Sequence, residues 1–167
     1  MLREGPFCAC SSSRRLLAVS SFVIVTYIAA PVDQCFALSL SIDAHTGSME
    51  QASERAVAGV TSGQIAYGET VTWSARHFGI RFRLTSKITE YEYPTRFVDE
   101  QISGPFKRWW HEHEFIADGK LTRMIDRIEF DAPFGVLGRI AERVVLDRYM
   151  KRLIGRRNQW LKRELEM

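Results

Sequence analysis

Two histidines one residue apart, His111 and His113, are the side chains in this sequence best suited to acid–base chemistry. An imidazole titrates near neutral pH, so it can take up or release a proton under physiological conditions. Side chains alternate between the two faces of a β-strand. A strand over 108–116 would therefore place both histidines on one face, together with Trp109 and Phe115. These aromatic neighbours indicate that this face points inward.

An aspartate on the neighbouring strand could act with these histidines. Asp118-Gly119 is typical of a tight hairpin turn, so a strand over 121–131 should pair with the histidine strand. Because side chains alternate along that strand, Asp126 shares its inward face with the apolar residues Met124 and Ile128. The sequence therefore predicts that Asp126 lies close to His111 or His113.

Three interpretations of this His–Asp group stay open. It can be a structural or ligand-orienting cluster, because buried polar groups pair when unpaired ones are costly. It can be a general acid–base pair in which Asp126 fixes the imidazole tautomer. It can also be a metal site with His111 and His113 as two ligands and Asp126 as a third. No other residue adds a ligand at a fixed spacing, and we expect neither a metal nor a cofactor.

The elements that must position these residues form a series of short segments. Turn residues separate predicted strands over 55–62, 69–77, 80–91, 96–103, 108–116 and 121–131. Short connections between consecutive strands imply an antiparallel meander. A β-branched run over 22–28 predicts an earlier strand, and Pro31 then begins a helix over about 32–45.

The chain after Pro133-Phe134-Gly135 is predicted to be helical to about Glu166. Its apolar residues, Leu137 and Val144 among them, recur at steps of three and four and form one stripe. Thirty residues of helix would be about 45 Å long, so the stripe needs a broad partner. We therefore predict an α+β fold, in which a curved antiparallel sheet of six to seven strands wraps around a long C-terminal helix.

The C-terminal segment is also strongly basic. Residues 139–163 hold nine basic and two acidic residues, a net charge of +7, whereas the whole chain of 167 residues carries only +3. The basic residues are Arg139, Arg143, Arg148, Lys151, Arg152, Arg156, Arg157, Lys162 and Arg163. They form either a solvated outer face or a surface attracted to anionic membranes. No aromatic platform interleaves the basic stripe as in single-strand binders, so we expect no nucleic-acid partner.

The N-terminal region allows two interpretations. We predict a disordered extension over 1–18 and one ligand-binding domain over 19–167. An odd count of three cysteines does not form a disulfide framework, which favours a cytoplasmic location. The alternative is a secreted or periplasmic protein, in which residues 14–30 act as a signal peptide.

Several dispersed motifs carry a resemblance to known proteins. They include Ala29-Ala30-Pro31, Gly68–Trp73, Phe97–Gln101, Trp110–His113 and Pro133-Phe134-Gly135. On these residues, over about 20–166, the chain resembles the SRPBCC superfamily of START, birch-pollen-allergen and polyketide cyclase relatives, and in particular its bacterial SRPBCC family proteins. The resemblance implies a helix-grip fold, with a cavity between sheet and helix for lipids, quinones, polyketides or steroids. It implies no shared catalytic motif.

Three hypotheses for function follow. We favour a non-enzymatic binding protein for an apolar small molecule. The alternatives are a cyclase or dehydratase that uses His111, His113 and Asp126, and a module that contacts a protein or a membrane. His45 and His77 lie beside predicted turns and are expected to be capping or surface residues. The expected cavity is lined by Trp73, Trp109, His111, His113, Phe115, Met124, Asp126, Ile128, Leu137 and Val144.

Overall fold

The computed structural model describes residues 20–131 and 145–167. Within this part of the chain, seven strands form one antiparallel sheet in the order β1-β7-β6-β5-β4-β3-β2. Consecutive strands from β2 to β7 are neighbours, so they form the predicted meander, and β1 completes the sheet beside β7. The strands are β1 (Ser20–Ile28), β2 (Arg55–Gly59), β3 (Thr70–His77), β4 (Ile80–Glu92), β5 (Arg96–Ser103), β6 (Arg108–Asp118) and β7 (Leu121–Asp131).

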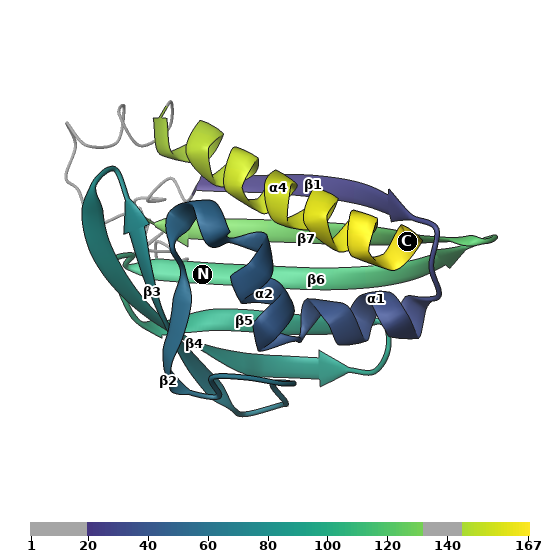
Figure 1. Cartoon of the computed structure of the whole chain (residues 1–167), viewed down its shortest axis with the longest axis horizontal. Helices are drawn as coiled ribbons and strands as arrows, with labels where there is room; N and C mark the ends of the chain where they lie inside the picture. The colour runs from purple at the N-terminus through teal and green to yellow at the C-terminus, as the bar shows by residue number, and fades with distance from the viewer. Residues whose placement is uncertain (1–19, 132–144) are drawn as a thin grey trace, which may run out of the picture.

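Helices cover one face of this sheet. Figure 1 shows α4 (Asp147–Glu166) lying along β1, with α1 (Val32–Ser39) and α2 (Ile42–Ser48) beside it. A short 3-10 helix over Glu50–Ala52 leads from α2 to β2. The C-terminal end of α4 is tied to the end of β1, because the Ala29 amide donates a hydrogen bond of 2.8 Å to Glu166 Oε1. The α+β helix-grip fold predicted from the sequence is confirmed.

The single helix predicted over 32–45 is wrong, because the chain forms two helices there. Ser41 has an extended backbone with ψ of 120°, which interrupts the helix after α1. Its hydroxyl then accepts a hydrogen bond of 3.2 Å from the Ala44 amide and caps the start of α2. Leu40 and Ile42 on either side of this break are both buried, so the apolar pattern continues through it.

The central hairpin follows the predicted alternation. In β6 the side chains of Trp109, His111, His113 and Phe115 are all buried. The β6–β7 register places His113 directly opposite Asp126. The predicted inward face of both strands is thereby confirmed, and its polar residues lie under the helices.

The apolar stripe of the C-terminal segment is observed where the structure describes it. Met150, Ile154 and Leu161 of α4 are buried against the sheet and the neighbouring helices. Leu137 and Val144 lie outside the described residues, and so does the extension predicted over 1–18. In the part of the chain that the structure describes, no helix has the length and apolar character needed to cross a membrane.

Candidate functional site

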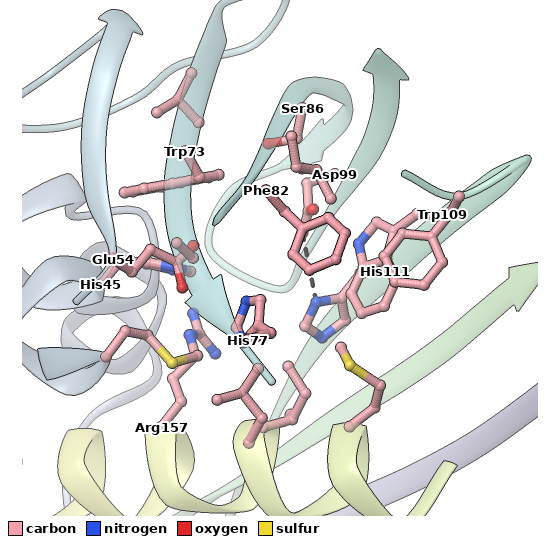
Figure 2. A pocket seen from close by; sticks show the side chains of 18 of the residues that line it. His45, Glu54, Trp73, His77, Phe82, Ser86, Asp99, Trp109, His111 and Arg157 are labelled. Atoms are coloured by element: carbon pink, nitrogen blue, oxygen red, sulfur yellow. Dashed lines mark hydrogen bonds and ion pairs between the residues drawn. The ribbon is translucent and has the colours of Figure 1, made fainter. Parts of the chain in front are cut away.

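A cavity of about 420 Å³ lies between α4, α2 and the sheet. Most of its wall is aromatic and aliphatic, with Val71 and Trp73 from β3, Phe82 from β4, Phe97 from β5 and Ile154 from α4. Figure 2 shows a smaller number of charged and ionisable groups between these apolar side chains. These groups are His45, Glu54, His77, Asp99, His111, His113 and Arg157.

The two histidines of β6 lie between two aspartates. His111 Nε2 is 2.9 Å from Asp126 Oδ1, and His113 Nε2 is 3.0 Å from Asp99 Oδ2. The remaining ring nitrogens face the opposite carboxylates, with His113 Nδ1 3.0 Å from Asp126 Oδ1 and His111 Nδ1 3.6 Å from Asp99 Oδ2. The centroids of the two imidazole rings are 3.8 Å apart. Four ionisable side chains therefore form one closed cluster.

Neighbouring side chains hold this cluster in place. The Phe97 ring stacks on His113, with centroids 4.2 Å apart and an interplanar angle of 19°. Asn158 Nδ2 donates a hydrogen bond of 2.7 Å to Asp126 Oδ2 from α4. Arg157 is also buried, and its Nη1 lies 3.8 Å from Asp126 Oδ1. The helix and three strands together fix the positions of the carboxylates and the rings.

Burial and charge set the protonation of the cluster. Burial and the nearby His113 lower the pKa of His111, against the opposing effect of Asp126. Burial alone would raise the pKa of Asp126, but its hydrogen bonds with His111 and His113 hold that pKa well below its usual value. Burial also opposes ionisation of Asp99, whose pKa is nonetheless lowered by its hydrogen bond with His113. A neutral imidazole beside an ionised carboxylate can act as a general base.

A second polar group lies across the cavity. His45 of α2 stacks on Trp73 with centroids 4.1 Å apart, and its Nε2 is 3.3 Å from Glu54 Oε1. His77 Nδ1 is 2.5 Å from the hydroxyl oxygen of Tyr149 in α4. Both histidines line the cavity, so the expectation that they are capping or surface residues is wrong. Strand alternation offered a signal for His77, which shares the inward face of β3 with Trp73.

Eight of the ten residues predicted to line the cavity belong to the described part of the chain, and they fall into two groups. Trp73, Trp109, His111 and His113 do line it. Four others are fully or almost fully buried but do not contribute to its wall, because α1 and α4 pack directly over this part of the sheet. These four are Phe115, Met124, Asp126 and Ile128.

Three charged residues of the cavity wall were not assigned to it from the sequence: Glu54, Asp99 and Arg157. Asp99 lies opposite His111 in the β5–β6 register, which the sequence between the two strands does not determine. Arg157 was placed on the basic outer face of the C-terminal helix, and that placement is wrong because it is only 3% exposed. The position of Arg157 in the sequence indicates this burial, because steps of three and four residues place it on the same face of α4 as Ile154 and Leu161.

Comparison with solved structures shows the same fold in other proteins. The protein TTHA0849 from Thermus thermophilus has a TM-score of 0.73 and 17% sequence identity, over 87% of this chain and 97% of that one. The Zhui aromatase/cyclase from Streptomyces sp. R1128 has a TM-score of 0.72 and 12% identity, over 89% and 94%. A START superfamily protein from Mycobacterium smegmatis has a TM-score of 0.67 and 9% identity, over 87% and 97%.

A search of the curated proteins returned no match. The family model described as "Polyketide cyclase / dehydrase and lipid transport" matches residues 20–166. This range contains all described residues except the last one, together with the segment between the two described parts. This match agrees with the sheet, the helix across it and the cavity between them. The chain belongs to the polyketide cyclase / dehydrase and lipid transport family, within the SRPBCC superfamily.

Proposed function

We propose that the protein binds an apolar small molecule of the lipid, quinone or polyketide class in the cavity between α4 and the sheet. The observation that carries the proposal is the composition of the cavity wall, which surrounds a few buried charged groups with aromatic and aliphatic side chains. Small-molecule sites in proteins have this composition and volumes of roughly 300–1,000 Å³. The cavity, at about 420 Å³, falls within this range.

The polar groups of the wall would orient such a ligand. Arg157 donates a hydrogen bond of 3.1 Å to the Ser39 carbonyl, and its guanidinium has further N–H donors. A carbonyl or phenolate oxygen of the ligand could accept from these donors. The stacked pair of His45 and Trp73 provides a flat apolar surface for the body of the ligand on the other side. We therefore expect a largely apolar ligand that carries at least one oxygen.

Native mass spectrometry of the protein and tryptophan fluorescence during titration with a fatty acid, a naphthoquinone and an aromatic polyketide test this proposal. Trp73 and Trp109 both line the cavity, so a bound ligand should change their emission. Ala75→Phe fills the cavity and should abolish binding. Arg83→Phe, on the exposed face of the neighbouring strand, is the matched control and should leave binding intact. Equal binding by both variants would show that the cavity is not the binding site.

One observation favours a second candidate, a cyclase or dehydratase. His111 lines the cavity and is paired with the buried Asp126, as a general base and its orienting carboxylate would be. Similarity in fold to an aromatase/cyclase is consistent with such chemistry. On this hypothesis His111→Gln loses turnover of a poly-β-ketone thioester analogue, whereas its affinity for the product is retained. Turnover that persists in His111→Gln would reject the general base.

A further inference from the structure

We propose that Asp99, His111 and His113 form a site for a divalent transition-metal ion such as Zn²⁺ in the cavity wall. One donor atom from each residue lies within 4.8 Å of the other two. Asp99 Oδ2 is 3.0 Å from His113 Nε2 and 3.6 Å from His111 Nδ1. Ligand atoms of a tetrahedral zinc site are about 3.3 Å apart, because each bond is about 2.0–2.1 Å long. The distances from Asp99 Oδ2 to the two nitrogens, 3.0 and 3.6 Å, lie close to this value.

Asp126 does not bind the ion in this site, although the sequence suggested it as a third ligand. Its Oδ1 is 2.9 Å from His111 Nε2 and 3.0 Å from His113 Nδ1, the two ring nitrogens that face away from Asp99. Histidines that bind metals usually donate their other N–H to a carboxylate or carbonyl, which fixes the ring orientation. One buried carboxylate is placed to accept from both histidines in this way.

The count of N–H donors favours an ion over a network of hydrogen bonds alone. A neutral imidazole has one N–H, yet each of these rings faces a carboxylate with both nitrogens. If His113 donates to Asp99 through Nε2, its buried Nδ1 has no proton to donate to Asp126 Oδ1, which lies 3.0 Å away. An ion bound to His111 Nδ1 and His113 Nε2 removes this mismatch, because the protons then occupy the two nitrogens that face Asp126.

The charge of the cluster also favours a cation. Asp99 and Asp126 together carry two negative charges, and Arg157 supplies one positive charge 3.8 Å from Asp126. Asp99, in contrast, has only histidines as ion-pair partners among the described residues. A carboxylate in a largely apolar cavity is costly without a cationic partner, and an ion bound to Asp99 would supply that partner.

Packing holds the three ligands ready for an ion. His113 stacks on Phe97, and His111 meets the edge of Trp109 with ring centroids 6.2 Å apart. Asp99, His111 and His113 all line the cavity, so the remaining coordination positions of the ion would face a bound molecule. Metal binding does not depend on the proposed ligand, and the two can be measured separately.

The test uses the whole protein after treatment with a chelator, without an organic ligand. Calorimetric titration with Zn²⁺ should show one equivalent bound, and Co²⁺ at the same site should give visible d–d absorption. Asp99→Asn and His113→Gln should each weaken Zn²⁺ binding by more than about 100-fold. His77→Gln is the matched control, a cavity histidine outside the cluster, and should leave Zn²⁺ affinity unchanged. Circular dichroism of each variant shows whether it has folded.

A second measurement needs no variant. In the Co²⁺-bound protein, proton NMR should show two strongly shifted signals that disappear in deuterated solvent. They arise from the N–H groups at His111 Nε2 and His113 Nδ1, which face Asp126 and are shielded from water. Absence of these signals, failure of the wild-type protein to bind Zn²⁺, or full retention of Zn²⁺ binding in folded Asp99→Asn would overturn the proposal.

Discussion

Asn158 in the middle of α4 donates a hydrogen bond of 2.7 Å from Nδ2 to Oδ2 of Asp126 in β7. Both side chains are completely buried. The same amide nitrogen lies 3.2 Å from the hydroxyl of Thr26 in β1. One side chain thus connects the helix to two neighbouring strands. Because Asp126 contacts both histidines of the cluster, this connection also fixes the helix relative to the candidate site.

Replacing this amide should be costly. Asn158→Leu keeps a similar volume but leaves the buried carboxylate of Asp126 without its donor from the helix. Hydrogen bonds to charged groups contribute about 1.5–3 kcal/mol, so we expect the free energy of unfolding in urea to fall by about 2–3 kcal/mol. Gln159→Leu, at the exposed position next in α4, should change it by less than about 0.5 kcal/mol. An equal effect of both variants would mean that the loss does not come from the hydrogen bond to Asp126.

Most of the sheet could be predicted from the sequence because its signals are local. The alternation in β6 and β7 and the Asp118-Gly119 turn determine which side chains are buried and which strands pair. Ser41 shows where such patterns fail. The apolar pattern around Ser41 continues through the break between α1 and α2, so it predicts one continuous helix. The break depends on the single residue Ser41, whose hydroxyl caps the start of α2.

The candidate site could be predicted only in part, because much of it depends on long-range placement. His111, His113 and Asp126 belong to one hairpin, and their proximity follows from its register. Asp99 joins them through a strand pairing whose register depends on a loop. Arg157 enters the cavity through the rotation of α4 about its axis. A charged residue on an apolar helix face is easily assigned to the solvent side when its partners lie in distant strands.

Among the described glycines, Gly59 at the end of β2 has the least room for a side chain. Its φ is +72°, and a Cβ atom there would lie 2.1 Å from the Thr70 carbonyl oxygen. Gly63 has nearly the same φ of +73°, but no atom lies within 4 Å of its Cβ position. Gly63→Ala should therefore lower the free energy of unfolding by about 1 kcal/mol through backbone strain alone.

Gly59→Ala should lower it by at least about 2 kcal/mol more, because the strands β2 and β3 must also separate around the new methyl group. Urea denaturation of the two variants side by side measures this difference. Similar losses would indicate that β2 can shift away from β3 at little cost.

The basic face of α4 is smaller than its sequence indicates. Arg157 points into the cavity, and Lys151 and Lys162 form ion pairs with Asp147 and Glu166 within the helix. Each basic residue near an anionic membrane contributes on the order of 1 kcal/mol, so the remaining exposed arginines should give only weak attraction.

We therefore expect sedimentation with phosphatidylserine-containing vesicles at low ionic strength, and its loss at physiological salt. The triple substitution of Arg148, Arg152 and Arg163 by Gln should remove it. A triple Gln variant at the exposed positions Arg55, Arg81 and Arg83 has the same change in net charge and should still sediment. If both triple variants lose sedimentation together, the net charge of the protein, and not α4, governs the attraction.

The outer face of the sheet should contribute a measurable dependence of stability on pH. Glu112 of β6 accepts hydrogen bonds from Arg96 Nε at 2.8 Å and from Arg127 Nη1 at 2.5 Å. Burial acts to raise the pKa of Glu112, but the two arginines lower it below the usual 4.5. Because the folded-state pKa is lower than the unfolded-state one, this stabilisation is present above about pH 4.5 and is lost as the pH falls through the folded-state pKa.

Glu112→Gln isolates this effect from other carboxylates that titrate in the same range. At pH 7 it should reduce the free energy of unfolding by on the order of 1 kcal/mol, because both arginines are partly exposed and solvent weakens the pairs. The difference from wild type should shrink as the pH falls through the folded-state pKa of Glu112, below which Glu112 is itself protonated. Glu129→Gln removes the more exposed pair with Arg108 and should cost less at pH 7. A difference between Glu112→Gln and wild type that stays constant with pH would show that packing of the side chain, and not its charge, is what stabilises this face.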